Sequence, residues 1–139
     1  MAKVNSHVIA PQVAYQCHPH HRNNSLKKSQ WQITVQQEVA CFQLTYTQRW
    51  IVAAVGWGLH VVNNAPSFLG VAQNRQLRLF IAKFISAANG GGTQWHGYPA
   101  DHRASKDRPP DEVLNAWLVG GRLPAAKIRK VQKGEPCNL

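Results

Sequence analysis

Two histidines, His96 and His102, lie in the polar segment WHGYPADHRASKDRPPDEV, residues 95–113. Imidazole titrates near neutral pH, so two histidines can supply the acid and the base that metal-independent phosphodiester cleavage needs. Arg103 or Arg108 can hold the phosphate with a fork of donors, and Tyr98 can stack on a base. The set is chemically sufficient for a toxin-like ribonuclease. However, histidines at this spacing in a loop have no fixed mutual geometry.

The same segment also fits a structural connector, which is the interpretation we favour. Trp95 and Tyr98 would bury their rings, and the Asp101 carboxylate would accept backbone N–H groups beside it. Polar loops are often held in place in this way. The ion pairs expected within the segment join Arg103 and Arg108 to Asp107 and Asp111.

A second cluster of reactive side chains is CHPHH, residues 17–21. Cys17, His18, His20 and His21 are all of types that bind zinc or copper. A structural metal site needs four converging ligands, and Pro19 restricts the local chain. We therefore expect adventitious metal binding by a histidine-rich arm, with no dedicated metal centre and no cofactor.

Charge is the most unusual bulk property of the chain. Its 139 residues include 16 Lys and Arg against 6 Asp and Glu, which gives a formal net charge of +10 and a sequence pI near 10.1. Before residue 101 the only acidic side chain is Glu38. Such a chain attracts polyanions, so the charge favours either a nucleic-acid partner or simply a soluble basic surface.

The C-terminal region predicts two short helices. Pro109 and Pro110 precede DEVLNAWLV, Gly120 and Gly121 end it, and Pro124 begins a second helix through AAKIRKVQK. Helix, glycine turn and basic helix is the order of a DNA-reading helix-turn-helix, although a two-helix hairpin that closes a sheet fits the long turn better. In either case the second helix can contact phosphates. The predicted nucleic-acid-binding residues are Arg122, Lys127, Arg129, Lys130 and Lys133.

The remaining patterns predict an α+β domain with a small, mostly antiparallel sheet. Alternation in WQITVQ and CFQLTYT predicts strands at 31–36 and 41–46, and further strands are expected at 59–62 and 77–84. Thr47 is expected to cap a central helix at 48–56. Residues 1–29 have no sustained period and predict a loosely ordered N-terminal arm before a single domain, residues 30–139.

Several classes of protein are disfavoured. The three cysteines are odd in number and widely spaced, which argues against a disulfide framework and fits a reducing compartment. The N-terminus lacks the apolar core of a signal peptide, and no apolar run reaches membrane-spanning length, so a cytoplasmic protein is expected. Gly90–Gly92 lacks the features of a phosphate-binding loop, and no carboxylate pair suggests glycosidase or aspartic-protease chemistry.

The combination of LRLFIAKF, WHGYPADHR and DEVLNAWLVGGRLPAAKIRKVQKGEPC, within residues 77–137, resembles uncharacterised small bacterial proteins of the accessory genome, including integron gene-cassette proteins. The resemblance implies a bacterial, cytoplasmic protein of a mobile or niche-specific gene. It supplies no activity, cofactor or catalytic residue.

These observations favour a small, basic, non-catalytic protein that contacts nucleic acid through its C-terminal basic helix. Two alternatives remain open. One is a metal-independent ribonuclease that uses His96 and His102. The other is a protein-interaction or homodimer module whose charge serves only solubility.

Overall fold

The structure is a computed structural model that describes residues 5–86 and 94–139. Its helices are α1 (Val35–Gln48), α2 (Asp111–Val119) and α3 (Ala125–Gln132). The strands of the larger sheet are β1 (Asn5–Ala10), β2 (Val13–Cys17), β4 (Ile51–Val52), β5 (Val55–Val62), β6 (Ala65–Ser67), β9 (Ile81–Ser86) and β10 (Gln94–Ala100). The smaller sheet consists of β3 (Gln30–Trp31), β7 (Gly70–Val71) and β8 (Arg78–Leu79).

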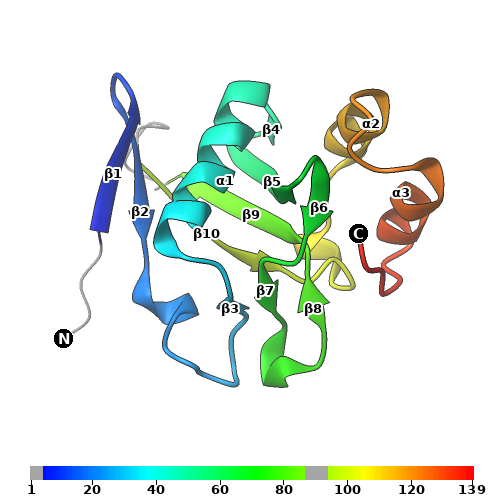
Figure 1. Cartoon of the computed structure of the whole chain (residues 1–139), viewed down its shortest axis with the longest axis horizontal. Helices are drawn as coiled ribbons and strands as arrows, with labels where there is room; N and C mark the ends of the chain where they lie inside the picture. The colour runs from blue at the N-terminus through cyan, green and yellow to red at the C-terminus, as the bar shows by residue number, and fades with distance from the viewer. Residues whose placement is uncertain (1–4, 87–93) are drawn as a thin grey trace.

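The larger sheet has the order β1-β2-β10-β9-β5-β4, and β6 pairs with β5. Its strand pairs are antiparallel, except that β2 and β10 run parallel. Figure 1 shows α1 across one face of this sheet, with α2 and α3 at the end away from the β1–β2 hairpin. The predicted α+β class, with a mostly antiparallel sheet, a central helix and a C-terminal helical pair, is therefore confirmed, although other residues than predicted form the central helix.

Two apolar clusters hold the layers together. Phe42 of α1 packs on Phe84 of β9 and Trp95 of β10, with ring centroids 5.2 Å and 5.5 Å away. Trp117 of α2 meets Trp50 edge to face in the second cluster, which also holds Ile128 and Val131 of α3. The helical pair thus covers the sheet with the residue types that its sequence pattern predicted.

The predicted strands at 31–36 and 41–46 are wrong, because most of this sequence forms α1. The Thr34 hydroxyl accepts a hydrogen bond from the Gln37 backbone N–H, and the Gln37 side chain accepts one from the Thr34 N–H, which is a capping box. Along the helix Glu38, Cys41, Phe42 and Thr45 are buried. Their spacing of three and four residues is helical, and it outweighs the alternation of apolar side chains.

The predicted helix at 48–56 is also wrong. Thr47 lies inside α1, and Arg49 ends that helix in the left-handed conformation. Ala53 and Ala54 both have positive φ and form the tight turn between β4 and β5. The predicted strand at 59–62 is the second half of β5, and the predicted strand at 77–84 is found as β8 and β9.

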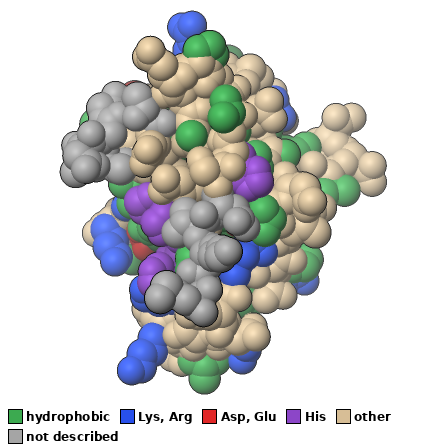
Figure 2. Space-filling model, turned by 90° about the vertical axis from the view of Figure 1, so that its left-hand side faces the viewer, with side chains coloured by type: hydrophobic (Ala, Val, Ile, Leu, Met, Phe, Trp, Pro, Cys, Tyr) green, Lys and Arg blue, Asp and Glu red, His purple; other side chains and the backbone are tan. Residues whose placement is uncertain are grey.

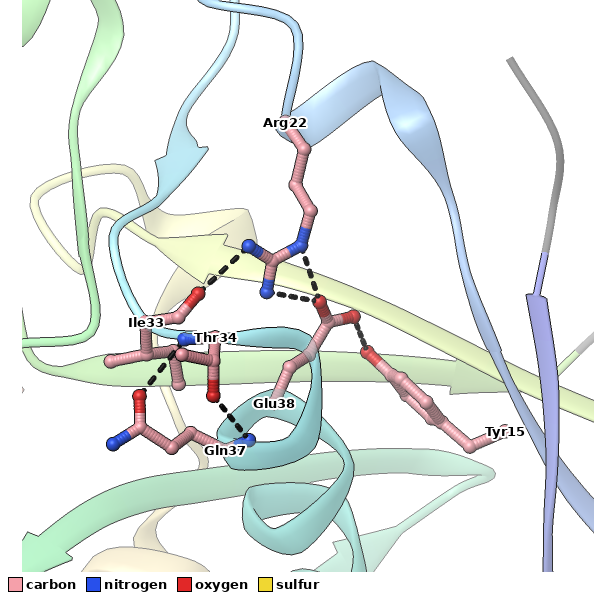
Figure 3. Close-up of polar contacts among 6 residues, drawn as sticks. All are labelled: Tyr15, Arg22, Ile33, Thr34, Gln37 and Glu38. Carbon is pink, nitrogen blue, oxygen red and sulfur yellow. Dashed lines mark hydrogen bonds and ion pairs between the residues drawn. The ribbon is translucent and has the colours of Figure 1, made fainter.

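The structure places residues 5–29 of the expected loosely ordered arm, residues 1–29, against the rest of the domain. The β1–β2 hairpin joins the sheet, and buried Gln30 accepts a hydrogen bond from the Asn24 backbone. Glu38, 1% exposed, accepts hydrogen bonds from the Tyr15 hydroxyl and from Arg22 (Figure 3). These contacts fix the N-terminal segment to α1, because a buried carboxylate requires partners.

The start of the segment at 95–113 is a strand, not a connector. Trp95 and Gly97 of β10 face α1, where a Cβ at Gly97 would collide with the Phe84 ring. Since successive side chains of a strand alternate, His96 and Tyr98 point to the opposite face of the sheet. Only residues 101–110, between β10 and α2, serve as the predicted connector.

Candidate functional site

The basic helix α3 forms where the sequence predicted it. Pro124 precedes it with extended backbone angles, and the Pro124 carbonyl oxygen accepts hydrogen bonds from the Lys127 and Ile128 N–H groups. Ile128 and Val131 are buried. Helical periodicity therefore turns the residues between and beside them outward.

The five predicted nucleic-acid-binding residues fall into two groups. The Arg122 guanidinium lies 5.3 Å from the centroid of the Trp50 ring, and Lys127 Nζ donates to the Leu139 carbonyl oxygen at 2.7 Å. Both side chains are half-buried. Arg129, Lys130 and Lys133 are exposed, and none of them forms an ion pair with an acid among the described residues. Of the five predicted residues, these last three are therefore the most available to a polyanion.

The two candidate catalytic histidines have separate roles. His102 is 5% exposed, and its Nε2 lies 2.6 Å from the Glu135 carbonyl oxygen, to which it donates. His96 instead lies beside His18, with ring centroids 4.5 Å apart. His102 therefore holds the C-terminal tail, and no contact joins it to His96 among the interactions of the described residues.

The side chains of Arg103 and Arg108 also bind groups of their own segment, residues 101–103. The Arg103 side chain binds the Asp101 carboxylate at 2.6 Å, and Asp101 also accepts the Arg103 backbone N–H. Arg108 donates to the carbonyl oxygens of His102 and Arg103. The Asp101 turn was predicted, whereas the predicted pairing of these arginines with Asp107 or Asp111 is wrong.

Histidines gather where the end of β2 approaches β10. His18 lies between His20 and His96, and Figure 2 shows histidine side chains near one another on this side of the molecule. Burial lowers the pKa of His18 and of His96, and the neighbouring imidazoles lower each further. Both rings are therefore neutral at neutral pH.

Tyr98 lies at the centre of a second polar cluster on the same face of β10. Its hydroxyl donates to Asp107 at 2.6 Å, and Lys83 Nζ lies 3.4 Å from the same carboxylate oxygen. Burial raises the pKa of Tyr98, and the hydrogen bond to the Asp107 carboxylate raises it further. The ring of His21 stacks on Tyr98 with centroids 5.1 Å apart. Tyr98 thus stays protonated and fixed in position.

The candidate metal ligands do not converge. Cys17 points into the core, where burial and the nearby Glu38 carboxylate raise the pKa of its thiol to about 12. His18, His20 and His21 follow along the chain outside that core. Among the described residues, no group of three or more His, Cys, Asp or Glu side chains could hold a metal ion.

Sequence reasoning missed a cavity beside Tyr98. Exposed lysines line it from two segments far apart in the chain, Lys27 and Lys28 from one and Lys106 from the other. The pair of adjacent lysines after CHPHH was the available signal. Its position next to Tyr98 depends on the approach of residues 18–29 to β10, which no local pattern shows.

The structure is therefore an α+β protein in which exposed cations lie on α3, beside the Tyr98 cavity and elsewhere on the surface. Comparison with protein-family models, with curated proteins and with solved structures found no match for the chain. Within residues 5–86 and 94–139, none of the helices is long and apolar enough to cross a membrane.

Proposed function

We propose that the protein binds nucleic acid without cleaving it, through the exposed cationic surface of α3. The observation that carries this proposal is that α3 buries Ile128 and Val131 while Arg129, Lys130 and Lys133 remain exposed. Packing of the apolar side fixes the orientation of the helix. Its cations are then presented to solvent on a rigid element, which suits contact with phosphates.

The charge of the whole chain supports the same proposal. A formal net charge of +10 concentrates polyanions near the surface and speeds their encounter with the protein. Asp111 of α2 contacts α3, where it accepts a hydrogen bond from Gln132 rather than from a cation. The lysines and arginine of α3 are therefore not neutralised by that neighbour.

Salt-dependent binding tests the proposal. Fluorescence anisotropy of a labelled duplex and a labelled single strand is measured over a range of salt concentrations with wild type and with Arg129→Gln/Lys130→Gln/Lys133→Gln. For a duplex, removal of one cation that binds a phosphate should flatten the slope of log affinity against log salt by about 0.9, and removal of all three should flatten it by about 2.7.

A control variant removes three exposed cations elsewhere. Arg49→Asn and Arg75→Asn suit the positive φ at these positions, and Arg78→Gln completes the set. The control should keep most of the wild-type slope. Equal flattening of the slope in the two triple variants, or no binding by wild type at low salt, would refute the proposal for α3.

The geometry gives less support to a ribonuclease that uses His96 and His102. Such an enzyme needs both imidazoles within reach of one phosphodiester. His102 is buried and bound to Glu135, whereas His96 lies beside His18. We therefore propose no cleavage by this pair.

A further inference from the structure

A cavity of about 380 Å³ lies between three parts of the chain that are distant in sequence. The segments are residues 21–29, the turn at 72–73, and residues 98–107. This volume is within the range of small-molecule binding sites and is much larger than a single phosphate needs. The cavity is separate from α3, none of whose residues lines it.

Hydrogen bonds between the walls hold the cavity in shape. Gln73 Nε2 donates to the Lys27 carbonyl oxygen at 2.7 Å, and the Asn74 backbone N–H donates to the Leu26 carbonyl oxygen at 2.8 Å. Within the segment 21–29, His21 Nδ1 donates to the Ser29 carbonyl oxygen at 2.8 Å. A ligand would therefore meet a largely formed site, which lowers the entropic cost of binding.

The charges that line the cavity favour an anion. Its two carboxylates already have partners: Asp101 binds Arg103 at 2.6 Å, and Asp107 contacts the Tyr98 hydroxyl and Lys83. The exposed lysines of the lining are Lys27, Lys28 and Lys106, and none of the three is paired with an acid among the described residues.

The cavity also offers aromatic surface. His21 and Tyr98 both line it, and their rings stack with an interplanar angle of 17°. The Ser29 carbonyl fixes the imidazole, and Asp107 fixes the phenol hydroxyl. A rigid pair of flat rings beside a group of lysines suits a ligand that has both a planar base and a phosphate.

We propose that this cavity binds one nucleotide, with its phosphate at Lys27, Lys28 and Lys106 and its base against the His21–Tyr98 ring pair. The nucleotide can be a free mononucleotide or the phosphorylated end of a single strand, since the two present the same chemistry. This proposal does not depend on nucleic-acid binding by α3.

The test is an amide NMR titration of the full chain with adenosine monophosphate, adenosine and a short single strand that carries a terminal phosphate. The variant Lys27→Gln/Lys28→Gln changes only exposed side chains, so it should fold as wild type does and give the spectrum of a folded protein. Saturable shifts from adenosine monophosphate should map to residues 21–29 and 98–107 in wild type. The variant should bind this nucleotide at least about tenfold more weakly, and adenosine should bind more weakly than its monophosphate.

The matched control is Arg49→Asn/Arg78→Gln, which removes the same charge outside the cavity and should bind the mononucleotide as wild type does. If Lys27→Gln/Lys28→Gln binds neither the single strand nor the mononucleotide, the result supports a strand end. If Lys27→Gln/Lys28→Gln loses binding of the mononucleotide but still binds the single strand, the result supports a free nucleotide. No saturable binding of either probe, shifts that map outside the cavity, or equal weakening in the two variants would overturn the proposal.

The α3 variant separates this proposal from the proposed function. Arg129→Gln/Lys130→Gln/Lys133→Gln should bind the duplex more weakly and with a flatter salt dependence, while its affinity for adenosine monophosphate is unchanged. If duplex binding does not depend on α3 but the mononucleotide still binds in the cavity, the proposed function fails and the nucleotide site stands.

Discussion

Removal of Arg22 should destabilise the protein strongly, because it would strand a buried carboxylate. Arg22 donates twice to Glu38, at 3.0 Å and 2.8 Å, and once to the Ile33 carbonyl oxygen at 2.7 Å (Figure 3). In Arg22→Met the Glu38 carboxylate, 1% exposed, loses its cationic partner but keeps the Tyr15 hydroxyl at 2.5 Å. Breaking a buried ion pair costs about 3–5 kcal/mol. The Arg22 side chain is 23% exposed, so we expect the low end of this range, about 3 kcal/mol.

The double variant Arg22→Met/Glu38→Gln removes both charges and leaves an amide oxygen that can accept the Tyr15 hydroxyl. We expect Glu38→Gln alone to cost about 1.5 kcal/mol and the double variant only about 2–3 kcal/mol, which is less than the sum of the single changes. The effects of the single changes do not add, because the second change removes the stranded charge.

Urea unfolding followed by tryptophan fluorescence gives these free energies, with the slope m expected to be unchanged. Arg22→Met should also lower Tm by about 10 °C. Single effects that add to within about 0.5 kcal/mol in the double variant would show that Arg22 and Glu38 are energetically independent, contrary to a buried ion pair.

Two further predictions concern titratable side chains. Burial lowers the pKa of His18 and His96 below the ordinary 6.5. The unfolded chain therefore binds more protons in this range, and stability should fall as pH drops from about 6.5 toward the lowered values. Urea unfolding across pH should show this fall, and it should be smaller in His96→Gln; an equal fall in both proteins would contradict the assignment. Burial also raises the pKa of Cys17 to about 12 and that of Cys41 further, whereas Cys137 is half-buried. A short pulse of iodoacetamide on the native protein should modify Cys137 alone by mass spectrometry, and modification of all three thiols at equal rates would be inconsistent with this core.

The C-terminal helices could be predicted from local sequence, because their boundaries depend on proline, glycine and a clear helical face. DEVLNAWLV is α2 residue for residue, and α3 lies within AAKIRKVQK. The same local signals determine the orientation of the cations on α3. For this reason the part of the candidate site that lies on α3 could be predicted from the sequence.

The N-terminal half was harder to predict, because its signals conflict. In α1 the apolar residues also alternate, so the capping box from Thr34 to Gln37 was the better evidence. The tight turn at Ala53 and Ala54 uses positive φ without glycine or asparagine, which composition does not reveal.

The approach of residues 18–29 to β10 depends on pairing between β2 and β10, which are far apart in the chain. Single-sequence patterns carry no information on such a contact. The cavity beside Tyr98 and the contact of His18 with His96 could therefore not be predicted, although His18, His96 and Tyr98 were singled out individually as candidate site residues.

An amide NMR titration of the wild-type protein with a short duplex shows most directly whether nucleic acid binds at α3. The largest shifts should lie in residues 125–133, should saturate, and should be reversed by added salt. Shifts confined to other elements, or a spectrum that the duplex leaves unchanged at low salt, would contradict it.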